Sequence, residues 1–197
     1  MNALPAPGLE DPVHDAQHAF RVALDALSRP GRILHLPGPI ADVPLGAAQA
    51  RLLLTLTDDA TPVWWQSGSV QLQKWLRFHT GARVASRTQD AEFAVVTQAA
   101  AMPELTRFAA GTAAAPERSC TLLIEVSSLT AGSAMRAHGP GIQDGIDIAV
   151  NGLPEGFWAE WQASHAGFPQ GVDLFFTCGE ALMALPRTSR IGRLRGV

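Results

Sequence analysis

The stretch FPQGVDLFFTCGEALMALPRTSRI, residues 168–191, decides the fold that we expect for this chain. Two short apolar runs, VDLFFTC and ALMALP, flank a break at Gly179 and Glu180, which is the pattern of a β-hairpin. The second run leads directly into a cluster of basic and hydroxyl residues, PRTSR at 186–190. Because arginine forks bind phosphate or carboxylate groups, this cluster is either a solvated tail or a contact surface for something anionic.

Helix-like and strand-like patterns mix through the rest of the chain. Apolar periodicity predicts helices at 13–27, 47–59, 69–80 and 154–166. Short strands are predicted at 32–36, 60–65, 92–97 and 145–150. Ser69 and Gly81 are the expected caps of the third helix. The first helix is expected to turn one apolar face to the core, formed by Ala16, Phe20, Ala23, Leu24 and Leu27.

The second half of the chain is expected to form local hairpins. Residues 120–129 and 134–142 are predicted to pair around a TAGS turn, and residues 143–147 to form a further turn. Residues 102–110 are predicted to form a short helix. This mixture indicates an α/β fold with a mixed sheet. We expect a single domain over residues 13–197, preceded by a flexible arm at 1–12.

Composition limits the classes of function. The chain has 197 residues, of which 47% are hydrophobic and 17% charged, and a formal net charge of −3. Charged residues make up about 25% of an average domain, so we expect packing or partners to cover much of this surface. Basic residues do not dominate, and the net charge is negative, so we expect no nucleic-acid partner. No signal-peptide pattern and no long apolar run is present, so we expect a cytoplasmic protein without a membrane partner.

Few residues offer a self-contained chemistry. Cys120 and Cys178 have no metal-ligand spacing and fit free thiols in a reducing compartment better than a disulfide. His14 and His18 are spaced to share a helix face, either as a pair of metal ligands or as an ordinary helix flank; we expect no metal. Lys74 is the only lysine and lies in a helical stretch, so we expect a solvated position rather than a Schiff base, and no cofactor.

The glycine loop HGPGI at 138–142 is the best candidate for an anion-binding loop. Two glycines beside a histidine could turn backbone N–H groups toward an anion, with an arginine one strand alternation away. Pro140 removes one such donor, and the alternative is a turn that merely leaves a strand. Together with the basic cluster, this loop gives six candidate residues for an anionic ligand or a partner interface: Arg136, His138, Gly139, Gly141, Arg187 and Thr188.

The order of several segments is more specific than any single motif. The chain contains, in this order, VHDAQHAFRVALDALSRPG, LLLTLTDDATPVWW, LRFHT, FAVV, GTAAAPERSCTLLIEVSSL, GPGI and FPQGVDLFFTCGEALMALPRT. Through these segments, from about Val13 to Thr188, the chain resembles the H subunit of the bacterial carbon–phosphorus lyase system, which degrades phosphonates. The last segment is the most specific part of the resemblance.

The resemblance carries expectations about fold, partners and reaction. It implies a single-domain three-layer α/β sandwich similar to the pyridoxal-phosphate-dependent transferases, but lacking the cofactor site. It implies a homodimer when alone and a core complex with the G, I and J subunits, with an ATPase-like L subunit as a further candidate partner. With the G, I and L subunits, the family is assigned to replacing the adenine of ATP by a phosphonate, which gives ribose 1-methylphosphonate 5-triphosphate. It implies no particular catalytic residue.

Two classes of function therefore stand beside each other. In the first, the chain is an accessory subunit of this transferase and works through its interfaces. In the second, the domain binds a small phosphorylated ligand itself and supplies part of an active site at a subunit boundary. A pyridoxal-phosphate enzyme built on Lys74 is a third and weaker interpretation.

Overall fold

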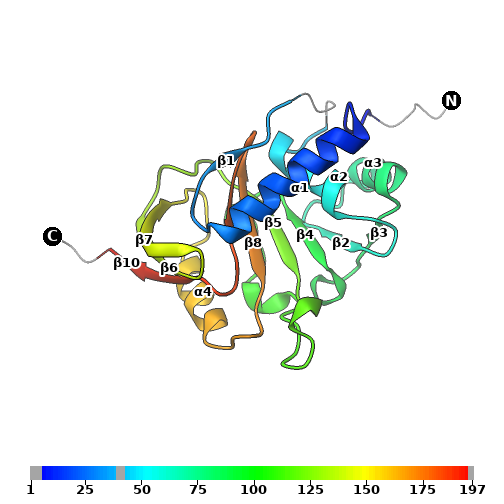
Figure 1. The fold of residues 1–197 in the computed structure, drawn as a ribbon. Helices are drawn as coiled ribbons and strands as arrows, with labels where there is room; N and C mark the ends of the chain where they lie inside the picture. The colour runs from blue at the N-terminus through cyan, green and yellow to red at the C-terminus, as the bar shows by residue number, and fades with distance from the viewer. Residues whose placement is uncertain (1–5, 39–42, 195–197) are drawn as a thin grey trace.

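The structure is a computed structural model that describes residues 6–38 and 43–194. Its centre is a seven-stranded mixed sheet in the order β1-β9-β8-β5-β4-β2-β3, and a three-stranded sheet in the order β10-β6-β7 lies beside it (Figure 1). The strands are β1 Leu34–His35, β2 Pro62–Trp65, β3 Arg83–Val84, β4 Phe93–Val96, β5 Thr121–Glu125, β6 Ala134–Gly139, β7 Ile142–Ala149, β8 Asp173–Cys178, β9 Ala181–Leu185 and β10 Arg190–Arg193. The first five residues of the expected arm and the last three residues of the expected domain lie outside the described residues.

The hairpin predicted within 168–191 is confirmed as β8 and β9, which pair antiparallel. On its other side β8 pairs in parallel with β5. Leu174 and Phe176 face one apolar core, and Phe175 faces the other. A strand that is buried on both faces carries a nearly continuous apolar run, which explains the consecutive apolar residues Leu174, Phe175 and Phe176 of β8.

Two layers cover the two faces of the seven-stranded sheet. On one face pack α1 (Pro12–Ser28), α2 (Ala47–Leu56) and α3 (Val70–Thr80), and on the other pack the three-stranded sheet and α4 (Phe157–His165) (Figure 1). The first layer is held by side chains such as Leu52 and Trp75, and the second by Met135 and Trp161. The α/β class with a mixed sheet and the four predicted helices are confirmed.

The ends of the helices follow their local chemistry. The Asp11 carboxylate accepts hydrogen bonds from the backbone N–H groups of Val13 and His14 and so caps α1. The Ser69 hydroxyl caps α3, and Gly81 ends it with a φ of 81°. Glycine adopts this left-handed conformation without strain. The caps predicted for this helix are confirmed.

The hairpin predicted at 120–142 is wrong. β5 lies between β4 and β8, to which it is parallel, whereas β6 pairs with β7 and β10 in the other sheet. The reason lies in burial: three consecutive residues of β5 are buried, while β6 alternates buried and more exposed positions, so each strand suits a different kind of sheet. The turn predicted at 143–147 lies inside β7, and the helix predicted at 102–110 contains only a single 3₁₀ turn at Leu105–Arg107.

The face of α1 that contacts the core also differs from the prediction. Ala19, Ala23 and Ala26 are buried, whereas Phe20 and Leu24 remain 48% and 50% exposed. α1 packs against α2 and β9, and small side chains let the helix approach them closely. The large apolar side chains are therefore left on the outer side of the helix.

The described part of the N-terminal arm contacts α3. The Nε2 atom of His79 donates to the carbonyl oxygen of Ala6 at 2.9 Å, and the indole N–H of Trp75 donates to that of Pro7 at 3.3 Å. Among residues 6–38 and 43–194, no helix combines the length and the apolarity that crossing a membrane requires.

Candidate functional site

The two segments that the sequence singled out for anion binding lie side by side. Strand β10, which sequence analysis did not predict, pairs antiparallel with β6 and places Arg190 opposite His138 and Gly192 opposite Arg136. The basic cluster at 186–190 is therefore not a solvated tail: it leads into an edge strand of the three-stranded sheet.

A small pocket of about 260 Å³ opens where these segments meet. It is lined by Gly139, Pro140, His165, Phe168, Thr188 and Arg190. Two of these residues, Gly139 and Thr188, belong to the predicted site. The other four come from the turn after β6, the end of α4, the segment that follows it and the start of β10.

Position 139 requires glycine, because the backbone of this residue approaches the backbone of Thr188 closely at the pocket. Its φ is 144°, and a Cβ atom at this position would lie 3.0 Å from the carbonyl oxygen of Thr188. Gly141 serves a different contact, because a Cβ there would lie 2.1 Å from the carbonyl oxygen of Ser28 at the end of α1. The HGPGI loop is thus shaped by packing on both of its sides.

Arg136 is engaged on the outer face of the small sheet. Its guanidinium donates to the Asp147 carboxylate at 2.7 Å and to the Asp144 carbonyl oxygen at 2.9 Å. His138 lies exposed on the same face. The ion pair with Asp147 neutralises much of the positive charge of Arg136, the arginine that sequence analysis predicted beside the glycine loop.

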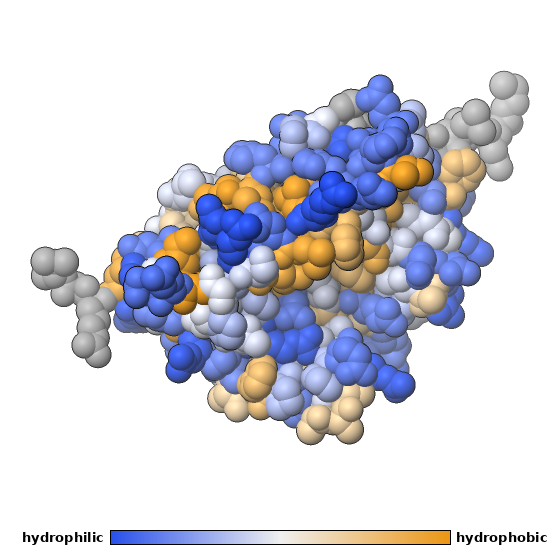
Figure 2. All heavy atoms as spheres, viewed as in Figure 1, coloured by the Kyte–Doolittle hydropathy of each residue, from blue (hydrophilic) through white to orange (hydrophobic). Residues whose placement is uncertain are grey.

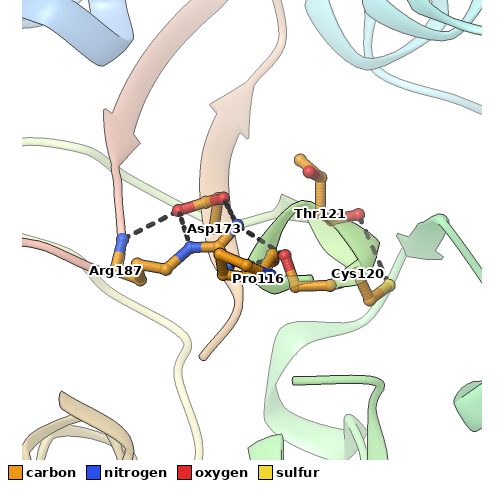
Figure 3. A network of polar contacts seen from close by, with 6 residues as sticks. Pro116, Cys120, Thr121, Asp173 and Arg187 are labelled. Carbon is orange, nitrogen blue, oxygen red and sulfur yellow. Dashed lines mark hydrogen bonds and ion pairs between the residues drawn. The ribbon is translucent and has the colours of Figure 1, made fainter. Parts of the chain in front are cut away.

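The Arg187 side chain points toward Asp173 and Pro116 (Figure 3), and Arg187 is not among the residues that line the pocket. Its guanidinium forms an ion pair with Asp173, donates to the Pro116 carbonyl oxygen at 2.6 Å and donates to the Ser119 hydroxyl. Its own carbonyl oxygen lies 3.0 Å from Nδ1 of His165. Arg187 therefore ties three segments together and, through its backbone, orients a histidine that lines the pocket.

A further polar cluster, which the sequence did not indicate, lies at the carboxyl end of the parallel strands. The Glu125 carboxylate accepts hydrogen bonds from the Thr177 hydroxyl and, at 3.0 Å, from the Gly179 N–H. It also lies against Gly46, the residue before α2. Ligands of α/β proteins commonly bind at this edge of the sheet, and here an internal carboxylate lies beside the start of a helix. A glutamate that ends an apolar strand is the signal that could have identified it.

The other reactive side chains occupy ordinary positions. Cys120 and Cys178 are free; burial, and to a smaller degree Glu92, raises the pKa of the Cys120 thiol. Lys74 is exposed on α3. No group of three or more histidine, cysteine or carboxylate side chains in the described residues is arranged to hold a metal ion.

His14 is exposed and lies 2.7 Å from the Asp11 carboxylate that caps α1. This hydrogen bond and the opposite charge raise the pKa of His14. The pKa of Asp11 is lowered by its hydrogen bonds from the backbone and side chain of His14. The partner of His14 is thus the helix cap, and His18 takes no part in the contact.

A wider groove of about 710 Å³ runs between the first turn of α4, the loop at 151–156 and the end of β10. Trp158 and Arg193 are among its lining residues. It lies on the opposite end of β10 from the small pocket, because β10 begins at Arg190 and ends at Arg193.

Fold and site together define a mixed-sheet α/β protein in which Arg136 and Arg187 are engaged by neighbouring groups of the chain and in which His165 and Arg190 are among the residues that line a small pocket. The family model described as bacterial phosphonate metabolism protein (PhnH) matches residues 7–192, and the chain belongs to this family. The family resemblance noted in the sequence is thereby confirmed.

Two relatives extend this finding. The chain is 43% identical, over 186 residues, to the alpha-D-ribose 1-methylphosphonate 5-triphosphate synthase subunit PhnH of Rhizobium meliloti (strain 1021), and the match covers 93% of each chain. It is 34% identical, over 177 residues, to the putative C-P lyase subunit protein HtxG of Stutzerimonas stutzeri, covering 89% of this chain and 85% of that one.

Proposed function

We propose that this chain is a subunit of a multi-subunit enzyme of phosphonate catabolism. In this role it acts with G, I and L subunits in replacing the adenine of ATP by a phosphonate, which gives ribose 1-methylphosphonate 5-triphosphate. The observation that carries the proposal is the match to a synthase subunit over 93% of both chains. We also propose a cytoplasmic location and a fold related to the pyridoxal-phosphate-dependent transferases without their cofactor site.

The exposed apolar face of α1 supports a role that works through interfaces. Val13, Phe20 and Leu24 follow one another at spacings of seven and four residues, which places them on one side of the helix. They are 63%, 48% and 50% exposed. Apolar side chains gather across the middle of the face on which α1 lies (Figure 2). Contiguous apolar patches of this kind mark protein interaction surfaces.

We infer that this face meets another subunit in the complex, with G, I and J subunits as the partners and a second copy of the chain as the partner in the isolated protein. The test is to co-express the chain with the G, I and J subunits from the same source and to measure the masses by size-exclusion chromatography with light scattering. A stable mixed complex is expected. A chain that elutes alone in every combination contradicts the proposal.

A second candidate function is that the domain supplies part of an active site at a subunit boundary. The observation in its favour is the pairing of β10 with β6, which brings the segment 186–190 to the glycine loop. Under this proposal the anionic ligand or partner contacts the predicted surface at Arg136, His138, Gly139, Gly141 and Thr188, and Arg187 supports this surface from inside through its ion pair with Asp173. Titration of the assembled complex with methylphosphonate and ATP, before and after Arg136→Ala, tests it. Identical binding by both proteins argues against a role of this surface.

A further inference from the structure

We propose that the small pocket between the turn after β6, the end of α4 and the start of β10 binds a –PO₃ group, as part of either a small phosphonate or a phosphate monoester. This inference rests on the second candidate function and names its ligand. It also shifts the binding site from Arg136 and Arg187, which are engaged elsewhere, to Arg190, His165 and Thr188.

Arg190 supplies the charge. Arg190 is one of the residues that line the pocket, and it is exposed. Four other arginines of the described chain, at positions 29, 87, 136 and 187, each form an ion pair with an aspartate. The guanidinium of Arg190 has no such partner among the described residues. An unpaired guanidinium fork presents several N–H donors in the geometry that binds phosphate oxygens bidentately.

His165 supplies a second polar group of fixed orientation. Its Nδ1 lies 3.0 Å from the Arg187 carbonyl oxygen. Since a carbonyl oxygen only accepts, Nδ1 carries the hydrogen, and Nε2 is the atom left for the pocket. Protonated Nε2 donates to an anionic oxygen, whereas neutral Nε2 accepts from the hydroxyl of a monoprotonated –PO₃H group. Thr188, which also lines the pocket, adds a hydroxyl.

No acidic side chain opposes an anion at this place. None of the six lining residues is acidic. Free carbonyl oxygens at the end of α4 would repel an anion. Those of Ser164 and His165 accept hydrogen bonds from the N–H groups of Gly167 and Phe168, at 3.0 and 3.1 Å. On the outer face of the small sheet, the Asp147 carboxylate pairs with Arg136.

The remaining walls and the volume define the ligand further. Phe168 is 56% exposed and, with Pro140, gives the pocket an apolar wall. The volume of about 260 Å³ lies below the range of roughly 300–1,000 Å³ that drug-sized ligands occupy. A –PO₃ group with a small apolar substituent, such as a methyl group, fits this combination better than a complete nucleoside triphosphate, whose base and sugar would extend outside.

The test is an NMR titration of the full-length isolated chain with methylphosphonate, inorganic phosphate and AMP as separate probes. The backbone amides of Gly139, Thr188 and Arg190 are the local reporters. Binding of at least one probe is expected to shift these amides. Arg190→Gln is expected to weaken that binding by about tenfold or more, as the loss of a hydrogen bond from a charged group does. His165→Asn, which keeps a donor for the Arg187 carbonyl oxygen, is expected to weaken it as well.

Arg193→Gln is the matched control. It makes the same change of charge on the same strand but lies at the wider groove, and it is expected to bind each probe as the wild type does. A response to methylphosphonate alone identifies a phosphonate site; a response to AMP or phosphate identifies a phosphate site of the same chemistry. The inference is overturned if no probe shifts the reporters in the wild-type chain, or if both glutamine variants lose binding equally.

Assembly separates this inference from the proposed subunit role. Arg190→Gln is expected to enter the mixed complex as the wild type does. If the wild-type chain binds a probe but joins no complex, the subunit proposal fails and the pocket stands. If Arg190→Gln blocks assembly but leaves probe binding to the isolated chain unchanged, Arg190 is an interface residue and the pocket inference is wrong.

Discussion

The backbone N–H of Arg187 and its Nε atom both donate to the same carboxylate oxygen of Asp173, at 2.8 and 3.2 Å. The side chains are only 16% and 21% exposed. The guanidinium also donates to the Pro116 carbonyl oxygen (Figure 3) and to the Ser119 hydroxyl. One arginine thus joins the end of β9, the start of β8 and the segment before β5.

Arg187→Ala is therefore expected to act first on stability. Breaking a largely buried pair leaves one charge without its partner, which costs about 3 kcal/mol. Urea unfolding of the isolated chain measures this loss. Arg190→Ala, three residues further along and exposed, is the control and is expected to change the free energy of unfolding by no more than about 0.5 kcal/mol. Equal stability of the two variants contradicts the structural role of Arg187.

The hairpin at 168–191 shows what could be predicted from the sequence. A strand buried on both faces carries a nearly continuous apolar run, so its pattern does not depend on which strands flank it. The ion pair between Arg187 and Asp173 follows from the same hairpin, because the pairing of Leu174 with Leu185 brings Asp173 near residue 187. Extending the strand register into the segment 186–190 would have predicted this ion pair.

Other features depend on contacts between distant parts of the chain. The pairing of β5 with β8 joins residues about 50 positions apart, such as Leu123 and Phe175. The hairpin predicted around the TAGS turn is based only on the sequence of the turn and its two neighbouring segments. The pocket needs β10 next to β6 and α4 packed against β10. The alternation of Arg190, Ile191 and Gly192, with only Ile191 buried, is the single local signal of that strand.

The outer face of α1 gives a second prediction. Phe20→Glu and Leu24→Glu, combined, are expected to change the stability of the isolated chain little, because exposed substitutions usually stay within about 0.5 kcal/mol each. Loss of apolar anchors from an interface costs about 2 kcal/mol or more, so the yield of mixed complex in co-purification should fall steeply. Phe78→Glu is the control, because Phe78 is 63% exposed on α3. Undiminished assembly of the double variant would exclude α1 as the interface.

Gly46 gives a third prediction, because it makes room for Glu125. A Cβ at Gly46 would lie 2.5 Å from one Glu125 carboxylate oxygen and 2.6 Å from the other. Gly46→Ala should displace the carboxylate and leave the Gly179 N–H without its acceptor, at a cost of about 1–3 kcal/mol.

A matched glycine and a double variant test this explanation. Gly68→Ala meets nothing within 4 Å and is expected to leave the urea midpoint almost unchanged. In a Glu125→Ala background the carboxylate is already gone, so adding Gly46→Ala should cost little more. Full additivity of the two changes would mean that Gly46 acts through another contact.

The two cysteines give a fourth prediction, on reactivity. Cys120 is completely buried, and burial, followed by the charge of Glu92, raises the pKa of its thiol. Since the thiolate is the reactive form, Cys120 should stay unmodified by iodoacetamide at pH 8 as long as the chain is folded. Cys178 is partly exposed and should be alkylated first.

Mass spectrometry of the native chain is expected to find one modification, at Cys178, and a second only after unfolding in urea. In Cys178→Ser the native chain should take up none. Alkylation of Cys120 in that folded variant would show that the core around β5 opens far more readily than its burial implies.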